Sequence, residues 1–502
     1  MRKIILPLFA VIAIFMVVDI ASARNLVILH TNDTHSTIDP DPETGMGGVL
    51  RRKVVVDSVR AVADNVLLVD AGDAVQGSLY FMVFEGEVER KMMNALGYDI
   101  AILGNHEFDN GLDKLAKQYR QLDAELLSSN YDMRGTVLDG LFLPYAIRVV
   151  DGRKIAFIGL NVNPDGLIDE SNIEGVEYHN PIEAANNLAS LLKHKEGADM
   201  VVAVTHIGYT SKDPAEQALD PLLAARSRDI DVIIGGHSHT RVMPGSPESL
   251  IPNLDGDTVL VAQTGKQGLF MGEIDIDLET LRPTYRLIPI NSRLDKAVDP
   301  ELAAMLSGYA HTVDSIAAIK IGSNEKAMSD DSAALLNFAA DFVFDWAVEL
   351  LGSSVDFAVM NQGGLRASLP KGDVTKGNIM DVFPFNNRVV VLEMTGADVR
   401  RLFDGLAVRG GEGVSRDVDI AMLPDRCRSI IINGKPLDDD VIYRVATIDY
   451  LAKGNDGMGP FKGQRQLARS GNPLYVDLIR YIEDMNARGV KIKSDGTMRM
   501  HK

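Results

Sequence analysis

Metal-ligand side chains follow five short apolar runs in the first half of the sequence. The runs span 26–29, 66–69, 100–103, 200–204 and 232–234, and each is typical of a buried strand. The side chains that follow them are Asp33, His35, Asp73, Asn105, His106, His206, His237 and His239. Carboxylates, an amide oxygen and imidazoles suit hard to borderline divalent cations such as Mn, Zn, Mg or Ca. The residues therefore predict a centre for two divalent metal ions.

The elements that position these side chains are predicted to be neighbouring strands. In an α/β arrangement the carboxyl ends of strands meet along one edge, where loops carry catalytic groups and strands hold them rigidly. Strand-like and helix-like stretches alternate up to about Ile288, which indicates an α/β fold. We therefore expect the ligands to converge at one edge of a sheet.

The segment Gly104 to Asp109, with the sequence G-N-H-E-F-D, is the most specific single motif. Asn105 offers a neutral oxygen ligand, and His106 is expected to stand beside the metals as a donor to a phosphoryl group. Asp109 can fix the tautomer of His106 and raise its basicity. Asp73 could bridge two cations through its two carboxylate oxygens, whereas Asp70 is expected to be structural.

Length and charge limit the possible functions. A chain of 502 residues is too long for one comfortable core, so two domains are expected. The net charge of -19 and the pI near 5.0 argue against a nucleic-acid polymer as partner, because phosphate backbones are bound by an excess of Lys and Arg. A small anionic substrate is compatible with this charge if bound cations attract it locally.

The first 23 residues are predicted to be a signal peptide. Arg2 and Lys3 precede an apolar stretch over 4–18, and Ala-Ser-Ala at 21–23 is a small-residue cleavage pattern. The alternative is an uncleaved anchor, but fifteen apolar residues fall short of the roughly 20 that a spanning helix needs. We expect an exported protein, periplasmic or extracellular, without a membrane span after cleavage. Cys427 is the only cysteine, so no intramolecular disulfide is expected.

A second domain is predicted after a connecting helix. The segment 299–318 has helical spacing of apolar residues and a Pro-containing start, and a long amphipathic helix is predicted over about 332–351. We therefore predict a first domain over 24–298, a connecting helix over 299–319 and a C-terminal domain over 320–502.

The ordered motifs D-x-H, G-D-x-x-Q-G, G-N-H-E-F-D, T-H and G-G-H-S-H resemble those of calcineurin-type metallophosphoesterases, specifically the secreted 5'-nucleotidase family. The segments 361–366, 382–387 and 454–457 extend the likeness into the second domain. The resemblance implies a metallophosphoesterase β-sandwich flanked by helices, with a second, α+β substrate-binding domain.

The resemblance also implies how the ligands are shared. One cation would be held by Asp33, His35, Asp73 and His239, and the other by Asp73, Asn105, His206 and His237. The family often has an amide where His239 stands, and a histidine there is the general metallophosphoesterase form. His106, oriented by Asp109, would stabilise charge on the phosphoryl oxygens.

In the second domain the family supplies arginines, an asparagine and two aromatic rings to the nucleotide. Asn361, Arg366 and Phe385 match that pattern. The stretch 327–331 lacks the further arginine that the family usually has before the long helix. The second ring is replaced by Met458, with Phe461 three residues later, and either one is expected to lie against the base.

The predicted function is that of an exported 5'-nucleotidase that hydrolyses nucleoside 5'-monophosphates through a water activated by two metals. The same chemistry could act on a 2',3'-cyclic nucleotide or a UDP-sugar instead. A third possibility is a binding protein without turnover, although a pure binder has no need of His106 and Asp109.

Overall fold

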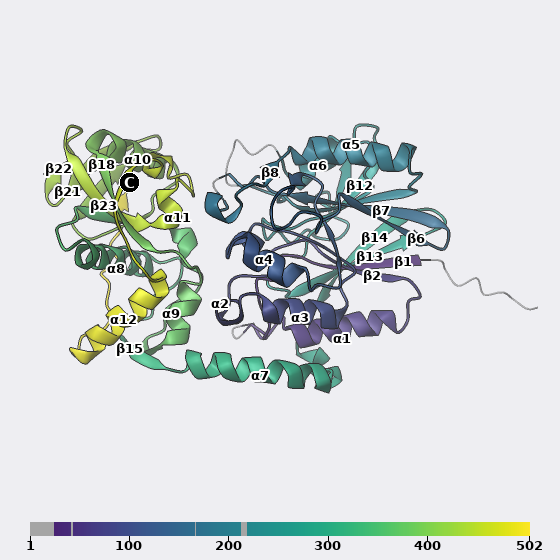
Figure 1. Ribbon diagram of the computed structural model, residues 1–502, viewed down its shortest axis with the longest axis horizontal. Helices are drawn as coiled ribbons and strands as arrows, with labels where there is room; N and C mark the ends of the chain where they lie inside the picture. Colours follow the sequence, from purple (N-terminus) through teal and green to yellow (C-terminus); the bar gives the residue numbers. More distant parts are fainter. Residues whose placement is uncertain (1–24, 42–43, 166, 212–217) are drawn as a thin grey trace, which may run out of the picture.

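The computed structural model describes residues 25–41, 44–165, 167–211 and 218–502. The predicted signal peptide lies outside the described residues. None of the helices in these ranges is both long and apolar enough to span a membrane. Figure 1 shows two lobes joined along one side by helix α7, Pro300–Ala317. We call them the N-terminal lobe, which contains β1 to β14, and the C-terminal lobe, which contains β15 to β25.

The N-terminal lobe is built on two six-stranded sheets. Their orders are β14-β13-β1-β2-β3-β4 and β11-β12-β10-β9-β7-β6. The first sheet consists of β14 (Arg282–Pro289), β13 (Phe270–Asp277), β1 (Asn25–Thr31), β2 (Val66–Asp70), β3 (Ile100–Ile102) and β4 (Glu125–Leu127). The second consists of β11 (Leu250–Pro252), β12 (Thr258–Ala262), β10 (Val232–Ile234), β9 (Met200–His206), β7 (Arg153–Asn161) and β6 (Tyr145–Val150).

The central strands of both sheets are parallel. β1 to β4 pair in parallel, and so do β7, β9, β10 and β12. Both faces of these strands are covered, which explains why their sequences are continuous apolar runs rather than alternating ones. β1, β2, β3, β9 and β10 confirm the five strands that the sequence predicts.

Helices cover the outer faces of the two sheets. Apolar side chains of β1, β2, β7, β9 and β10 form one core cluster between the sheets. α5 (Pro181–His194) and α6 (Asp220–Ala225) share a second cluster with the other face of the β9 sheet. α1 (Val49–Arg60), α3 (Glu87–Leu96) and α4 (Leu112–Tyr119) pack in a third cluster with the β1 sheet. The lobe is therefore the helix-flanked sandwich expected from the sequence.

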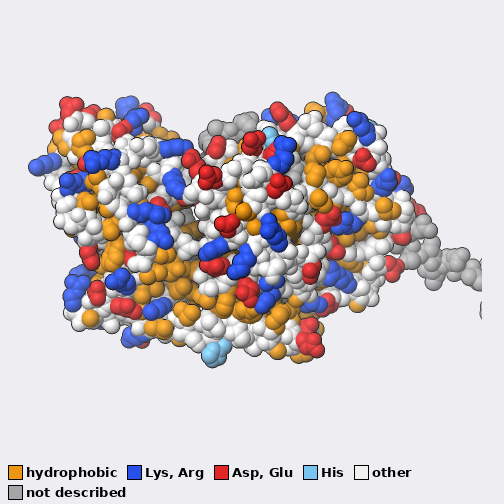
Figure 2. All heavy atoms as spheres, viewed as in Figure 1, with side chains coloured by type: hydrophobic (Ala, Val, Ile, Leu, Met, Phe, Trp, Pro, Cys, Tyr) orange, Lys and Arg blue, Asp and Glu red, His pale blue; other side chains and the backbone are white. Residues whose placement is uncertain are grey.

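The connecting helix α7 contacts both lobes. The Asp299 side chain caps it by accepting hydrogen bonds from the backbone N–H groups of Glu301 and Leu302, so the helix begins where the sequence predicts. It packs on α2 (Leu79–Phe84) and α3 in one lobe and on α9 (Lys376–Val382) in the other. Hydrophobic side chains gather low on the face shown in Figure 2, near α7.

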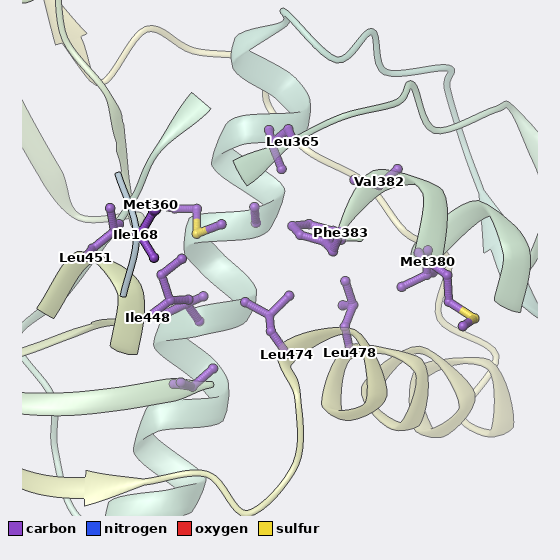
Figure 3. Packing of buried hydrophobic residues seen from close by; sticks show 14 of the residues in the cluster. Ile168, Met360, Leu365, Met380, Val382, Phe383, Ile448, Leu451, Leu474 and Leu478 are labelled. Carbon is purple, nitrogen blue, oxygen red and sulfur yellow. The ribbon is translucent and has the colours of Figure 1, made fainter. Parts of the chain in front are cut away.

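The C-terminal lobe is a mixed α+β unit. Its main sheet has the order β19-β16-β23-β18-β24, packed against α8 (Ala333–Leu351), the long helix that the sequence predicts. The strands are β19 (Gly413–Val414), β16 (Phe357–Met360), β23 (Ile442–Ile448), β18 (Val389–Thr395) and β24 (Arg465–Arg469). Figure 3 shows part of the core, where Phe383 lies near Leu474 and Leu478 of α12 (Leu474–Ala487).

Smaller elements complete this lobe. A four-stranded sheet runs in the order β22-β21-β20-β25, and β15 pairs with β17. Their bounds are Lys435–Pro436, Cys427–Ile432, Val418–Met422, Met500–His501, Lys320–Asn324 and Gly372–Thr375, in that order. The helices α10 (Gly396–Val408) and α11 (Asp449–Ala452) and the 3-10 helix η5 (Gly459–Phe461) lie between the later strands in sequence.

Candidate active site

The predicted metal ligands converge at the carboxyl ends of β1, β2, β3, β9 and β10. Asp33 and His206 are fully buried, and Asp73, His35 and Asn105 are 2–8% exposed. A sheet edge holds these side chains together because each follows the last residues of a rigid, buried strand. The structure thus brings all seven into one cluster.

Asp33 is fixed by its neighbour Asn32 and by the segment that follows β10. Its carboxylate accepts hydrogen bonds from Asn32 Nδ2, at 2.5 Å, and from the backbone N–H of His237, at 3.0 Å. Burial raises the pKa of Asp33 to about 7, against the lowering effect of nearby His206. This carboxylate is therefore in surroundings where a neighbouring cation favours its ionised form.

Asp73 lies between the two halves of the cluster. Its Oδ1 accepts the backbone N–H of His106, at 2.9 Å, and its Oδ2 lies 3.1 Å from Nε2 of His206 and 3.9 Å from Nε2 of His35. Burial opposes ionisation of Asp73, but the imidazoles around it hold its pKa well below the usual value. One carboxylate thus faces ligands of both predicted cation sites.

Glu107 is a positioning residue that the sequence analysis did not single out. Its buried carboxylate accepts backbone N–H groups of Asp73, Ala74 and Gly104, at 3.1, 2.8 and 2.6 Å. It therefore ties the loop after β2 to the loop after β3, and fixes the spacing of Asp73 and Asn105. Its place inside the G-N-H-E-F-D motif is the only sequence signal for this role.

The imidazoles present ring nitrogens to the cluster. His206 Nδ1 lies 2.7 Å from the carbonyl oxygen of Ala71 and donates to it, and Nε2 faces Asp73. Burial opposes protonation of His206, but Asp73 and Asp33 outweigh it and raise its pKa to about 10, so a bound cation would take the place of the Nε2 proton. The Nε2 atoms of His35 and His239 lie 2.9 Å apart, and Nδ1 of His237 lies 2.9 Å from Oδ1 of Asn105. These ligand-type atoms converge in two groups.

The two groups fit divalent cations. The ligand atoms of Asp33, His35 and His239 lie within 4.8 Å of one another, and so do those of Asp73, His206 and His237. Burial lowers the pKa of His237 to about 3 and that of His239 to about 4, so both rings are neutral and keep a lone pair. Neutral imidazole with carboxylate is a donor set that Zn and Mn accept.

The backbone at this cluster is strained. Asp33, His35, Asp73, His237 and His239 all have positive φ angles, between 46° and 74°. Such angles are uncommon for residues other than glycine and persist where the surrounding structure fixes them. Gly104 packs so closely on Asp73 that a β-carbon there would clash with its carboxylate. The sharp turns aim these side chains back into the cluster.

His106 and Asp109 form a pair beside the cluster. His106 Nδ1 lies 3.0 Å from Oδ2 of Asp109, within one turn of the 3-10 helix η1, His106–Phe108. Burial opposes protonation of His106, but Asp109 and Asp73 outweigh it and raise its pKa above the usual value. Asp109 therefore fixes Nδ1 as a donor, and Nε2 is available to a ligand.

A cavity of about 500 Å³ extends from the cluster to the C-terminal lobe. Asp73, Asn105, His106, Asp109, His237 and His239 line it on one side, and Asn361, Arg366 and Phe385 line it on the other. The ring centroids of His106 and Phe385 are 6.2 Å apart, and the Arg366 guanidinium lies 5.3 Å from the Phe385 ring centroid. The two lobes thus meet at the predicted catalytic pair.

Asn361 lines this cavity and carries an unsatisfied acceptor. Its Nδ2 donates to Asp456, at 2.5 Å, whereas its Oδ1 is buried without a hydrogen-bond partner among the described residues. A buried acceptor of this kind costs free energy unless a ligand or water satisfies it.

The expectation that Met458 or Phe461 lies against a base is wrong in this structure. Both side chains are fully buried in the apolar core of the C-terminal lobe, and neither lines the cavity. η5, which Met458 precedes and which ends at Phe461, packs against α10. Tyr450, at the start of α11, lines the cavity instead.

Three further cations lining the cavity were missed by sequence reasoning. Arg388, Lys453 and Arg469 belong to no motif that distinguished them, and the fold alone brings them to the cavity. Arg469 is paired with Asp449, at 2.8 Å, so its charge is partly balanced.

Comparisons with known proteins support the same interpretation. The family model described as calcineurin-like phosphoesterase matches residues 26–241, and that described as 5'-nucleotidase, C-terminal domain, matches residues 312–463. The 5'-nucleotidase of Vibrio cholerae is 30% identical over 86% of this chain and 85% of its own length. The chain belongs to the 5'-nucleotidase family.

Two further proteins are similar to this chain over most of its length. The trifunctional nucleotide phosphoesterase YfkN of Bacillus subtilis is 27% identical over 93% of this chain, which spans only 34% of that longer protein. The crystal structure of a 5'-nucleotidase precursor from Thermus thermophilus has a TM-score of 0.79 at 28% identity, covering 95% of this chain and 99% of that one.

Family membership confirms the predicted fold class and chemistry. The protein is a metal-dependent phosphoric monoester hydrolase, and two divalent ions are its cofactors. The N-terminal lobe carries the groups that can hold them.

Proposed function

We propose that the protein hydrolyses nucleoside 5'-monophosphates to nucleoside and phosphate in the cavity between the lobes. The observation that carries this proposal is the position of Phe385 and Arg366, which lie across the cavity from the metal-ligand cluster and next to His106. An aromatic ring and a cation at that place suit a base and a phosphate held in one molecule.

The metal ligands are assigned as the resemblance implies. Asp33, His35, Asp73 and His239 would hold one ion, and Asp73, Asn105, His206 and His237 the other. When bound, such ions draw in the phosphoryl oxygens and lower the pKa of a water for attack on phosphorus. The chain's own part is to fix these ligands at strand ends, so that little reorganisation is needed during the reaction.

His106 is assigned as the catalytic residue and Asp109 as its positioning partner. With Nδ1 turned to Asp109, Nε2 of His106 donates to the phosphoryl group or to the leaving oxygen. Asp109 keeps the ring in that tautomer and orientation. A general acid and charge donor of this kind typically contributes about 10² to 10⁴ in rate.

The C-terminal lobe is assigned the nucleotide. Arg366 would pair with phosphate, Phe385 would stack on the base, and Asn361 would hydrogen-bond to the nucleotide. In this assignment residues 24–298 bind the metal ions, residues 299–319 connect the two domains, and residues 320–502 bind the substrate. Removal of residues 1–23 would place the mature enzyme in the periplasm or outside the cell.

A UDP-sugar is the second candidate substrate. Arg388 adds a positive charge to the cavity beyond Arg366, which suits a second phosphate group, whereas Lys453 and Arg469 are paired with Asp169 and Asp449.

Phosphate release by the purified mature protein, with Mn or Zn added, tests the proposal. The substrates are AMP, UMP, a 2',3'-cyclic nucleotide, UDP-glucose and p-nitrophenyl phosphate, with a His106→Ala variant as control. We expect the highest kcat/KM for the monophosphates and its loss in the variant. A higher kcat/KM for UDP-glucose or the cyclic nucleotide would show that this ester is the preferred substrate. Absence of metal-dependent phosphate release would contradict the proposal.

A further inference from the structure

One loop of the N-terminal lobe inserts an apolar side chain into the C-terminal lobe. This loop, Ile168 to Asn172, follows β7 and includes the 3-10 helix η2, Glu170–Asn172. Ile168 is only 5% exposed and belongs to the large apolar cluster that runs through both lobes. Figure 3 shows it beside Met360, Ile448 and Leu451. The Ile168 side chain is thus packed against apolar side chains of the other lobe.

Charged groups join the lobes next to Ile168. Asp169 pairs with Lys453, and its Oδ1 also accepts the backbone N–H and the hydroxyl of Ser171, at 2.9 and 2.6 Å. The Asp169 side chain is 22% exposed, so its ion pair is partly shielded from water. Glu170 pairs with Lys462 at 2.7 Å, but both side chains of that pair are well exposed. The first pair is therefore expected to contribute more than the second.

The same loop is tied to the segment that follows His106. Asn172 Nδ2 donates to the carbonyl oxygen of Asp109, at 3.0 Å. One residue further along, Asn110 accepts a hydrogen bond from Asn386 of the C-terminal lobe, at 2.8 Å. A continuous set of contacts therefore leads from Ile168 to the backbone of Asp109.

These contacts lie at the cavity, away from α7. Ile168, Asp169, Ser171 and Asn172 line the same cavity as His106 and Arg366. In Figure 1 the loop before β8 (Glu177–Tyr178) approaches α11 on the side of the interface opposite α7. The lobes are joined covalently on one side and held by Ile168 and Asp169 on the other. Separation of the lobes would expose Ile168 and break the Asp169 pair.

We propose that Ile168 and Asp169 are positioning residues that clamp the C-terminal lobe against His106, so that substrate is bound between closed lobes. The proposal rests on the proposed function, because a substrate is expected to contact both lobes. The apolar contact favours the closed arrangement, and the ion pair fixes its register. Loss of the clamp shifts the population toward open molecules, which weakens apparent substrate binding in proportion.

An Ile168→Ala variant tests the apolar part, with Leu167→Ala as matched control. Both changes shorten an aliphatic side chain that lines the cavity, at adjacent positions, but Leu167 is 36% exposed and outside the apolar cluster. We expect Ile168→Ala to raise KM for the preferred substrate about ten-fold. Single-turnover release at saturating substrate should stay within about two-fold of wild type, since bound substrate restores closure. Ile168→Val keeps most of the apolar side chain, so its KM should be much closer to the wild-type value than that of Ile168→Ala.

The distance between the lobes gives a readout independent of activity. Dyes are attached to cysteines placed at the exposed Lys195 and Ser429 in a Cys427→Ser chain, and energy transfer is measured without substrate. We expect Ile168→Ala to populate a second arrangement with a different transfer efficiency, which Leu167→Ala does not.

The ion pair supplies a second variant that leaves the apolar core intact. Asp169→Asn is expected to raise KM about three-fold, whereas Glu170→Gln, at the exposed pair, should leave it unchanged. The double variant Asp169→Lys with Lys453→Asp, which reverses the pair, should bring KM part of the way back to the wild-type value.

Equal KM values and equal energy transfer in Ile168→Ala and Leu167→Ala would overturn the clamp. A protein that releases phosphate from none of the tested esters would contradict the proposed function instead, and the energy-transfer result would still decide whether Ile168 holds the lobes together.

Discussion

The metal-ligand cluster and the substrate side of the cavity are built in different ways. The cluster takes its side chains from the ends of buried strands, and five of them sit on strained backbone held by groups such as Glu107. The substrate side takes its residues from loops of the other lobe, where Phe385 is half-buried and Arg366 is exposed. Rigid support suits groups whose geometry the chemistry fixes, and loops suit groups that adapt to a substrate.

This difference in support explains why the predicted metal ligands lie together whereas part of the predicted substrate site does not. The strand-end ligands occupy one cluster, as their order in the sequence predicts, whereas Met458 and Phe461 lie in the core. We therefore expect changes in the cluster to abolish the reaction and changes in the C-terminal lobe to alter affinity.

The largest effect is expected for Asp73→Asn. Asp73 faces ligands of both cation sites, so its loss should lower kcat/KM by about 10³ or more. Asp70→Asn is the matched control, because Asp70 is equally buried but accepts hydrogen bonds from Thr31 and Gly72. Steady-state phosphate release measures both. If Asp70→Asn lost as much activity as Asp73→Asn in folded protein, the bridging role would be wrong.

The second-largest effect on activity is expected for His106→Ala. The side chain lies beside the cluster and is not among the assigned ligands, so kcat should fall by about 10² to 10⁴ while both metal ions stay bound. Activity and metal content are measured on the same sample. Loss of a metal ion would show that His106 is a ligand, which its proximity to His35 and Asp73 also permits.

Arg366→Met sharpens the contrast between the lobes. It removes a cation from the cavity without touching the metal ligands, so KM for a nucleoside monophosphate should rise about ten-fold or more. Metal content should not change. A fall in kcat with unchanged KM would mean that Arg366 acts only in the transition state.

The smallest effects separate Phe385 from Met458. Phe385→Leu should raise KM for AMP several-fold but leave p-nitrophenyl phosphate nearly unaffected, because only AMP carries a base to stack. Met458→Ala should leave both KM values unchanged and destabilise the protein by about 2 to 5 kcal/mol, as expected for a fully buried methionine. Kinetics and denaturant unfolding of the two variants give these values. An altered KM for AMP in Met458→Ala would show that Met458 takes part in substrate binding.

Local patterns in the sequence account for much of the fold and of the metal site. Apolar runs followed by ligands predict both the strands and their shared edge, and the N-caps Asp299 and Ser332 mark the starts of α7 and α8. Long-range packing decides the rest. Neither the burial of Met458 behind the cavity nor the insertion of Ile168 into the other lobe has a local signal, because each depends on surfaces distant in sequence.

We infer that one lobe holds two metal ions and that the other places the nucleotide against them. Anomalous diffraction from crystals of the mature protein, grown with Mn and a non-hydrolysable nucleotide analogue, tests it most directly. We predict two Mn peaks that share Asp73, with the phosphate between them and Arg366 and the base on Phe385. A single peak, or an analogue bound outside the cavity, would contradict this account.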